Sequence, residues 1–361
     1  MYVAFGSGNL WKTTNNGLDW KPIFENQPTL GIGDIAIAPS NSEILYLGTG
    51  ESLRKNRNFT MPGTGIYRSD NGGETWVHLG LEDTWHIGEI AVHPLNPNIV
   101  FVAAMGKFWS KSTSMGIYRT ENGGRSWKRV LFVDENTRAN DIVISQSNPN
   151  IMYASMWENN SKQNIAESVY GPKSGIFRSE DGGLNWEKLT KGLPKGPKIG
   201  RIGLAVSHKN EQKVYALIDN RNNTGGNSAE VYKSINGGQS WQRSHRDTLH
   251  IFPSNNIGWY FADIYVNPLD DDELYTLGVR MARSINGGKS FAIIQGLVQH
   301  IQPSPAQTLH LDHCELWINP TNPDHIAVGN DGGLYVSYDK GDNWLHPVSY
   351  THLTLPTILL V

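Results

Sequence analysis

The sequence predicts an all-β fold, a seven-bladed β-propeller of four-stranded antiparallel blades, and three observations carry this prediction. A short motif of the form IYRSDNGGETW recurs seven times in the 361 residues, beginning at positions 10, 66, 117, 176, 231, 281 and 334. The copies lie 50 to 59 residues apart at their Asn or Asp, and a repeat of this length suits a four-stranded blade. The composition agrees, because 38 glycines and 12 tryptophans with only 18% charged residues are typical of a turn-rich β-protein.

Each repeat contains the strands that such a blade needs. Ahead of each motif after the first lie an apolar strand, a turn with Pro or Asn, and a second strand rich in Val, Ile and Tyr, as in residues 87–106. We name these strands A and B; residues 65–69 are then a strand C, and residues 75–79 are a strand D. The chain opens on a strand of the B type at residues 2–8, so the first blade is predicted to be incomplete at its N-terminus.

The motif has the chemistry of a tight turn between strands C and D. Its Asn or Asp side chain can accept hydrogen bonds from amides of the same loop, and its Gly reaches a positive φ without a Cβ clash. The Trp that follows is expected to return into the core of the blade. We therefore interpret the motif as a structural device. Its central residues include Asn71, Asn122, Asp181, Asn236, Asn286 and Asp339.

The motif resembles the Asp-box, or bacterial neuraminidase repeat, S-x-D-x-G-x-T-W. The matching residues in one copy are Ser69, Asn71, Gly73, Thr75 and Trp76. Sialidases, xyloglucanases, sortilin-type receptors and a photosystem II assembly factor carry such repeats, and residues 96–109 and 329–341 are most similar to bacterial sortilin/xyloglucanase-like proteins. The resemblance covers residues 1–345, predicted to form a single propeller. Residues 346–361 are an atypical tail that reads as non-native read-through sequence; the alternative is that PTILLV, residues 356–361, closes the ring as the missing strand of the first blade.

The resemblance implies an exported bacterial protein, extracellular or in the cell envelope, that acts on or binds a carbohydrate. Xyloglucanases of this type hydrolyse O-glycosyl bonds in a cleft between two propellers, and a second propeller is expected in the full-length protein. Because one propeller is present here, the sequence leaves open whether the chain is an enzyme. The alternative is a non-catalytic, sortilin-like propeller that binds a peptide or protein, or an assembly factor. A sialidase is disfavoured because it needs an arginine triad and usually shows an Arg-Ile-Pro start, whereas the sequence has only GRIGLA, with Arg201.

The ligand is predicted on one particular face of the propeller. In this fold the D–A and B–C connections share a face, here named the loop face, and it carries the longest connections, which are rich in aromatic residues. Sugar rings stack on aromatic side chains that are ringed by polar groups. The predicted contacts to a polysaccharide or peptide are Trp85, His86, Trp109, Trp157, Trp259, Tyr260, His310 and His313. The alternative is that several of these aromatic residues pack the loops onto the blades.

Carboxylates on the same face are the catalytic candidates. A glycosidase needs two carboxyl groups across the scissile bond, roughly 6.5–9.5 Å apart in an inverting enzyme. The sequence selects no pair among Asp331, Glu51, Asp312, Glu158 and Asp219. His310, Asp312 and His313 form the densest polar cluster, and a hydrogen-bonded network is favoured over a metal site because their spacing matches no zinc signature. No cofactor and no metal is predicted.

The A strands carry a second pattern. One polar residue is expected at the matching place in successive blades: Asp34, Glu89, Asp141, Arg201, Asp263 and Glu315. This pattern predicts an acidic ring with one arginine along the central channel. Either the ring lines a solvated pore with repeated hydrogen bonds, or its crowded carboxyl groups have raised pKa values and some of them serve as acids.

Other kinds of partner are disfavoured by composition. The formal net charge of -3, without a basic block, argues against nucleic-acid binding. No apolar run approaches the roughly 18 residues that a membrane span needs. Cys314 is the only cysteine, so the chain forms no internal disulfide.

Overall fold

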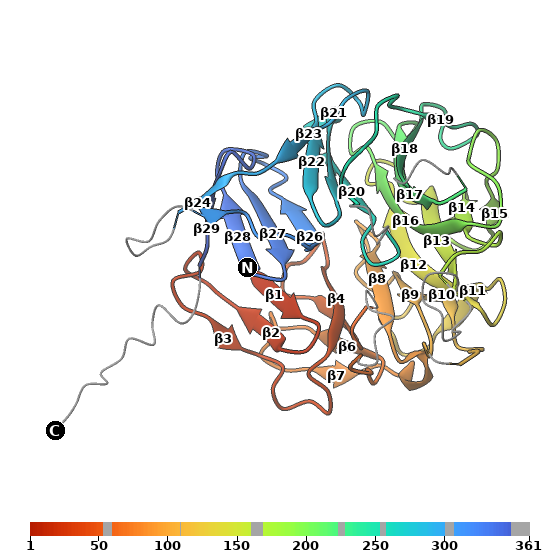
Figure 1. Ribbon diagram of the computed structural model, residues 1–361. Helices are drawn as coiled ribbons and strands as arrows, with labels where there is room; N and C mark the ends of the chain where they lie inside the picture. Colours follow the sequence, from red (N-terminus) through yellow and green to blue (C-terminus); the bar gives the residue numbers. More distant parts are fainter. Residues whose placement is uncertain are drawn as a thin grey trace.

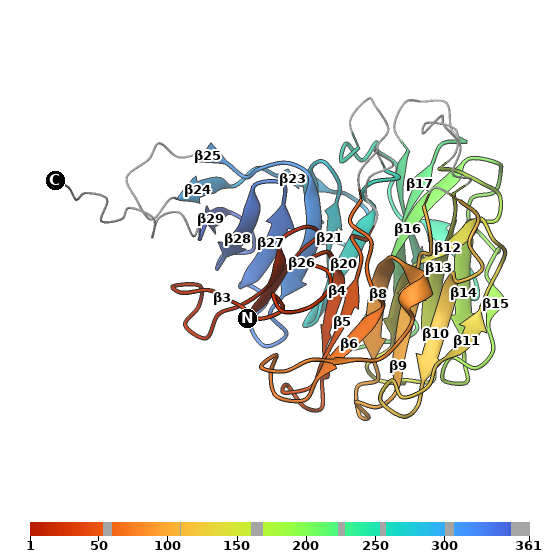
Figure 2. The same ribbon diagram turned by 90° about the horizontal axis from the view of Figure 1, so that it is seen from below.

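The structure is a computed structural model of the chain and describes residues 1–52, 60–108, 110–159, 169–222, 228–252, 258–299 and 307–347. These residues form seven β-sheets that stand side by side around a central axis (Figure 1 and Figure 2). The one helical segment in this described part is a 3-10 turn, η1 (Glu82–Thr84). The predicted fold class, an all-β propeller of seven blades, is confirmed.

Five sheets have the predicted four antiparallel strands, ordered along the chain from the axis outward. The second to fourth blades are β4–β7 (Ile32–Ile37, Leu45–Thr49, Ile66–Ser69, Val77–His78), β8–β11 (Ile87–Val92, Val100–Ala104, Gly116–Thr120, Lys128–Leu131) and β12–β15 (Thr137–Ile144, Met152–Glu158, Gly175–Ser179, Glu187–Lys188). The fifth and sixth blades are β16–β19 (Ile199–Val206, Val214–Asn220, Ala229–Ser234, Gln242–Arg243) and β20–β23 (Asp263–Asn267, Asp270–Leu277, Met281–Ser284, Ala292–Ile294).

The first and seventh sheets depart from four strands. The first has the order β1-β2-β3 (Tyr2–Phe5, Asn9–Lys12, Lys21–Pro22) and, among the described residues, no strand inside β1, as predicted for this blade. The seventh has six strands, in the order β25-β24-β29-β28-β27-β26. Their bounds are Leu297–Gln299 for β24, Gln307–Thr308 for β25, His313–Ile318 for β26, Ile326–Asn330 for β27, Gly333–Ser337 for β28 and Asn343–Leu345 for β29. The parallel pairing of β24 with β29 was not predicted, because the sequence indicated only a connection ahead of β26.

The hydrophobic core is divided among the contacts between neighbouring blades. In one cluster, Tyr153 and Ile176 of the fourth blade pack against Ile202 and Ile218 of the fifth, with Trp241 beside them. Full burial of such side chains stabilises the fold by about 1.5–3 kcal/mol each. The Trp of the repeated motif thus lies between its own blade and the preceding one, and does not stay within a single blade.

The seven C–D turns, all within the described residues, share one pattern of hydrogen bonds. In the second blade the Ser69 hydroxyl donates to Asn71 Oδ1 over 2.9 Å, and Asn71 Oδ1 also accepts from the Thr75 amide over 2.9 Å. The Gly73 amide donates to Ser69 Oγ over 2.8 Å, and Gly73 has a φ of 89°. The other six turns repeat these bonds. The predicted closure of the turn by its Asn or Asp is therefore confirmed.

Candidate functional site

Five carboxylates occupy matching positions on the inner strands. The register between each inner strand and its neighbour pairs Asp34 with Gly48, Glu89 with Ala103, Asp141 with Ser155, Asp263 with Leu277 and Glu315 with Gly329. Some of these side chains link successive blades, because Asp34 Oδ2 accepts from the Ile90 amide over 2.6 Å and Asp141 Oδ2 accepts from the Leu204 amide over 2.8 Å. The predicted acidic ring exists, and it joins the inner strands as well as lining the axis.

The predicted place of Arg201 in this register is wrong. In the fifth blade the matching residue is Gly203, opposite Leu217. A Cβ on Gly203 would lie 2.2 Å from the carbonyl oxygen of Ala262, so the approach of the sixth blade leaves no room for a side chain there. Arg201, two residues earlier, still reaches the ring and pairs with Asp263 over 3.3 Å. Its Nε and Nη1 atoms have no hydrogen-bond partner among the described residues, although the residue is only 4% exposed.

Crowding and burial raise the pKa of two ring carboxyl groups, Glu89 and Asp141. Burial, followed by repulsion from Asp34 and the other ring carboxylates, raises the pKa of Glu89 well above its ordinary value. Burial and the Asp263 charge raise the pKa of Asp141 to about 7, against the opposing pull of the Leu204 amide and Arg201. The same surroundings raise the pKa of Tyr265, whose hydroxyl donates to Glu315 over 2.7 Å. The ring therefore holds protons near neutral pH.

The channel beside the ring contains a cavity of about 420 Å³. Its lining runs from Glu89 and Asp141 to the A–B turns at Pro39, His208 and Pro268, so this space extends towards the face opposite the loop face. Its walls combine ring carboxylates with apolar side chains of the inner strands. The carboxyl groups of the ring are thus accessible through the channel from the side of the A–B turns.

On the loop face, several predicted contact residues are buried and hold the connections in place. Trp157 is fully buried, and its indole Nε1 donates to the Val169 carbonyl over 2.8 Å. It belongs to a cluster with Met105, Phe108, Val169 and Tyr170, against which Trp259 packs. His86 Nδ1 lies 2.9 Å from the Glu51 carbonyl oxygen, and burial lowers the pKa of its imidazole to about 4. For these side chains the structure favours the packing interpretation.

Other predicted contact residues keep part of their surface open. Trp85 is 38% exposed, has a φ of 60°, and carries the Lys107 ammonium 4.8 Å from its ring centre. Trp259 and Tyr260 are half-buried, with ring centres 5.7 Å apart in an edge-to-face arrangement. Trp109 lies outside the described residues. Of the predicted contact residues within the described ranges, Trp85, Trp259 and Tyr260 therefore keep aromatic surface open on this face.

The arginine that braces this face was missed by sequence reasoning. Arg138 is fully buried at the start of the fourth blade, and its Nη1 donates to the carbonyls of Met105 and Lys107 over 2.6 and 2.7 Å. Its guanidinium lies 4.5 Å from the ring centre of Phe108, and burial lowers its pKa to about 9. These contacts fix residues 105–108, including the lysine that lies over Trp85. No motif marks this arginine in the sequence.

Among the loop-face carboxylates, Asp219 has the most unusual surroundings. It lies near the end of β17 and is fully buried, and a Cβ on Gly258 would approach its Cγ to 2.5 Å. Neither carboxylate oxygen has a well-aligned hydrogen-bond donor among the described residues, although the Ser228 and Tyr170 hydroxyl groups are close enough to hold its pKa down. Burial outweighs them and raises the pKa of Asp219 to about 7.

The predicted catalytic candidates Glu51, Asp312 and Asp331 lie in two different parts of the propeller, outside the acidic ring. Glu51 follows β5 and packs near Gly6 of the first blade. Asp331 is exposed in the turn between β27 and β28, and Asp312 has a φ of 67° just ahead of β26. The Asn330 side chain donates to the His310 carbonyl over 3.1 Å, so the hairpin that carries Asp331 contacts the connection that carries Asp312.

The histidine cluster straddles the start of a strand. β26 begins at His313, so His310 and Asp312 lie in the connection ahead of it and do not share a strand face. His310 is exposed, whereas His313 is buried, and burial lowers the pKa of His313 to about 4. Across the described ranges, no group of three His, Cys, Asp or Glu side chains is placed to hold a metal ion.

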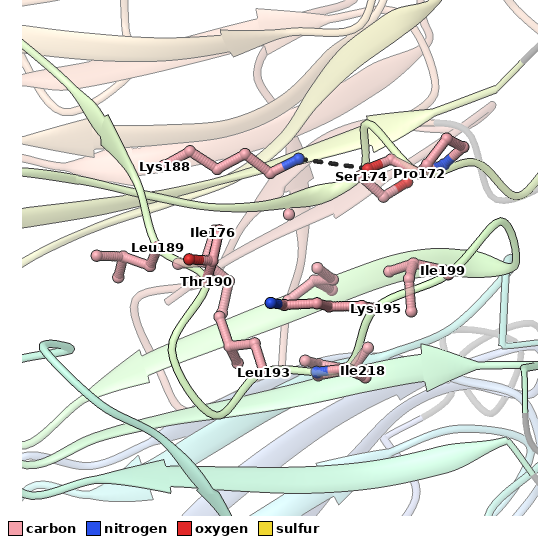
Figure 3. A pocket seen from close by; sticks show the side chains of 14 residues that line it. Pro172, Ser174, Ile176, Lys188, Leu189, Thr190, Leu193, Lys195, Ile199 and Ile218 are labelled. Carbon is pink, nitrogen blue, oxygen red and sulfur yellow. Dashed lines mark hydrogen bonds between the residues drawn. The ribbon is translucent and has the colours of Figure 1, made fainter.

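A second cavity, of about 270 Å³, lies between the fourth and fifth blades (Figure 3). Apolar side chains line it: Ile176, Leu189, Leu193, Ile199, Ile202 and Ile218. Lys188 and Lys195 border it, and Lys188 Nζ donates to the Pro172 carbonyl over 3.4 Å. Burial lowers the pKa of Lys188. The connection 189–198 was not among the predicted sites because it has no aromatic residue. Its Gly, Pro and Lys content is the feature of the sequence that could have indicated a cavity there.

These features define a β-propeller with an acidic inner ring and a part-exposed aromatic face. No protein-family model matches the chain. It is 22% identical over 314 positions to xyloglucanase Xgh74A of Acetivibrio thermocellus, covering 78% of this chain and 35% of that protein. It is 19% identical over 400 positions to a xyloglucanase of Paenibacillus sp., covering 95% of this chain and 36% of that protein. The chain thus spans about a third of the length of the curated relatives it matches.

Solved structures support the fold. An ancestral GH74 enzyme superposes with a TM-score of 0.55 at 17% identity, covering 95% of this chain and 52% of that one. YCF48 bound to D1 peptide also superposes with a TM-score of 0.55, at 12% identity, covering 94% of this chain and 89% of that one. The chain is therefore a β-propeller with distant sequence similarity to xyloglucanases. In the described residues, no helix has the length and hydropathy of a membrane crossing.

Proposed function

We propose that this propeller binds a xyloglucan-type polysaccharide on its loop face. The observation that carries the proposal is the part-exposed aromatic surface of Trp85, Trp259 and Tyr260 on a face braced from below by buried side chains. Rigid aromatic rings stack on the apolar faces of sugars at a small cost in conformational entropy. The sequence similarity to xyloglucanases supports the choice of polysaccharide. Such a ligand is extracellular, so the proposal includes export to the cell surface or beyond.

Replacing Trp85 or Trp259 by alanine is expected to weaken xyloglucan binding about tenfold, equivalent to about 1.4 kcal/mol, because each change removes a stacking surface. Affinity electrophoresis in gels with and without xyloglucan measures the effect. Tyr338→Ala is the matched control, since Tyr338 is 53% exposed on a C–D turn of the opposite face. Equal retardation of all variants would place the ligand elsewhere. No retardation of the parent chain by any polysaccharide would leave a peptide as the ligand.

Hydrolysis is a second candidate function, favoured by Asp219. A glycosidase acid must keep its proton near neutral pH, and burial gives Asp219 a pKa of about 7. Tyr170 and the backbone at Gly258 cover the carboxyl group, so a substrate reaches it only after one of them moves. The partner carboxylate stays a prediction among Glu51, Asp312 and Asp331.

If Asp219 is the acid, reducing-sugar release from xyloglucan is expected to fall as the pH rises above about 7, because the acid form is then lost. Asp219→Asn is expected to abolish release while xyloglucan still retards the variant in the gel. Glu51→Ala and Asp331→Ala test the partner. Undiminished release by Asp219→Asn would remove Asp219 from the reaction, and the absence of release by the parent chain would leave the binding function alone.

A further inference from the structure

The connection between the fourth and fifth blades borders the apolar cavity of Figure 3 and is held at both of its ends. At one end the Leu189 amide donates to the Ile176 carbonyl over 2.8 Å. At the other end the Lys198 carbonyl accepts from the Arg221 amide over 2.9 Å. Residues 193–196, between these two bonds, line the cavity. The connection is therefore attached to both blades, on either side of the space that it borders.

The residues of this connection oppose its collapse into the cavity. Gly192 has a φ of 81°, and a Cβ there would lie 1.8 Å from the Trp241 carbonyl oxygen, so only glycine fits. Pro194 and Pro197 each have a fixed φ, which reduces the number of conformations open to the segment. Protein interiors contain few voids larger than a water molecule. A cavity of about 270 Å³ with such a wall is therefore a candidate ligand site.

The floor of the cavity is aliphatic and belongs to the core between the two blades. Four isoleucines form it, each 4% exposed or less: Ile176, Ile199, Ile202 and Ile218. Leu189 and Leu193 pack against the same core cluster and line the cavity as well. An apolar cavity of about 150 Å³ holds benzene, so this larger space admits an apolar group of about ten carbon atoms.

Two lysines give the rim of the cavity a positive charge. Lys188 extends over Gly175, where a Cβ would lie 2.6 Å from the lysine Cε. Its Nζ donates to the carbonyls of Pro172 and Lys173 over 3.4 and 3.1 Å. Lys195 points from the connection across the cavity (Figure 3). None of the described residues that line the cavity is acidic, so the wall supplies no counter-charge to either ammonium group.

We propose that this cavity binds a small carboxylate with an aliphatic tail, of the medium-chain fatty acid type. The tail lies on the isoleucine floor, and the carboxylate accepts a charge-assisted hydrogen bond from Lys195. Lys188 stands beside it, but two backbone carbonyls already occupy its ammonium group, so Lys195 is the main partner. The site uses other residues than the aromatic ones proposed to bind polysaccharide, and it does not depend on that function.

Isothermal titration calorimetry of the full chain with octanoate, and with octan-1-ol as its uncharged analogue, tests the proposal. Octanoate is expected to bind about tenfold more tightly than the alcohol, because only the carboxylate pairs with an ammonium group. Lys195→Met is expected to remove this difference, and Leu193→Trp to abolish binding of both probes by filling the cavity. Lys191→Met is the matched control, since Lys191 is exposed in the same connection and does not line the cavity. Thermal unfolding checks that each variant is folded.

Four results would overturn the proposal. Failure of both probes to bind the parent chain would show that the cavity takes no aliphatic ligand. Octanoate binding that persists in folded Leu193→Trp would place the site elsewhere. Equal affinity for octanoate and octan-1-ol, unchanged in Lys195→Met, would exclude recognition of the carboxylate. Binding of an acetylated tripeptide that ends in leucine, without binding of octanoate, would make the C-terminus of a protein the occupant.

Discussion

Replacing Arg201 by methionine is expected to lower the free energy of unfolding by about 3–5 kcal/mol at pH 8, because it removes the buried positive charge that faces Asp263. The loss should be smaller at pH 5. Glu89 and Asp141 of the ring have pKa values raised in the folded state, to about 7 for Asp141, so their stabilising contribution is fully present below about pH 4 and is lost as the pH rises through about 7. Without the arginine, the decrease in stability between pH 5 and pH 8 becomes larger.

Urea denaturation at pH 5 and pH 8 measures this difference. Arg201→Lys is the matched control, because it keeps a positive charge beside Asp263, and its loss of stability should not grow with pH. An equal loss for Arg201→Met at both pH values would contradict the electrostatic account. In that case the arginine would stabilise the channel through packing alone.

The Asp219→Asn variant is expected to be more stable than the parent chain above pH 7. The pKa of Asp219 rises from an ordinary 3.8 to about 7 on folding, which corresponds to about 4 kcal/mol between the two charge states. The parent chain therefore loses this contribution as the pH rises from about 4 through about 7. The amide does not ionise, so the variant keeps its stability over the same range.

Thermal and urea unfolding at pH 5 and pH 8.5 test this expectation. Asp331→Asn is the control, since Asp331 is exposed in a hairpin turn and its replacement should leave the pH dependence unchanged. A variant that is less stable than the parent at both pH values would show that ionised Asp219 accepts hydrogen bonds that the fold needs. If Asp219→Asn is stable but releases no sugar, Asp219 has a catalytic role and the fold does not depend on its charge.

Much of the site could not be predicted from the sequence, because its side chains come into contact only between different blades. Trp157 and Trp85 look alike in the sequence, yet one is fully buried and the other is 38% exposed. Whether an aromatic residue in a long connection covers a blade or faces solvent depends on the neighbouring connections, here residues 105–108 and 169–170. The isolation of the Asp219 carboxyl group likewise arises from Tyr170 and Gly258, which are distant in sequence.

The number of blades, the closure of each C–D turn and the acidic character of the inner strands could all be predicted from the repeats in the sequence. These features repeat locally: each turn is closed by residues at most four positions apart, and a recurring pattern reveals them without knowledge of distant contacts. The contacts between blades, which no local pattern shows, place Gly203 at the ring position and let Arg201 reach the ring from two residues away. The reason is steric, because the backbone of the sixth blade comes so close to Gly203 that no side chain fits.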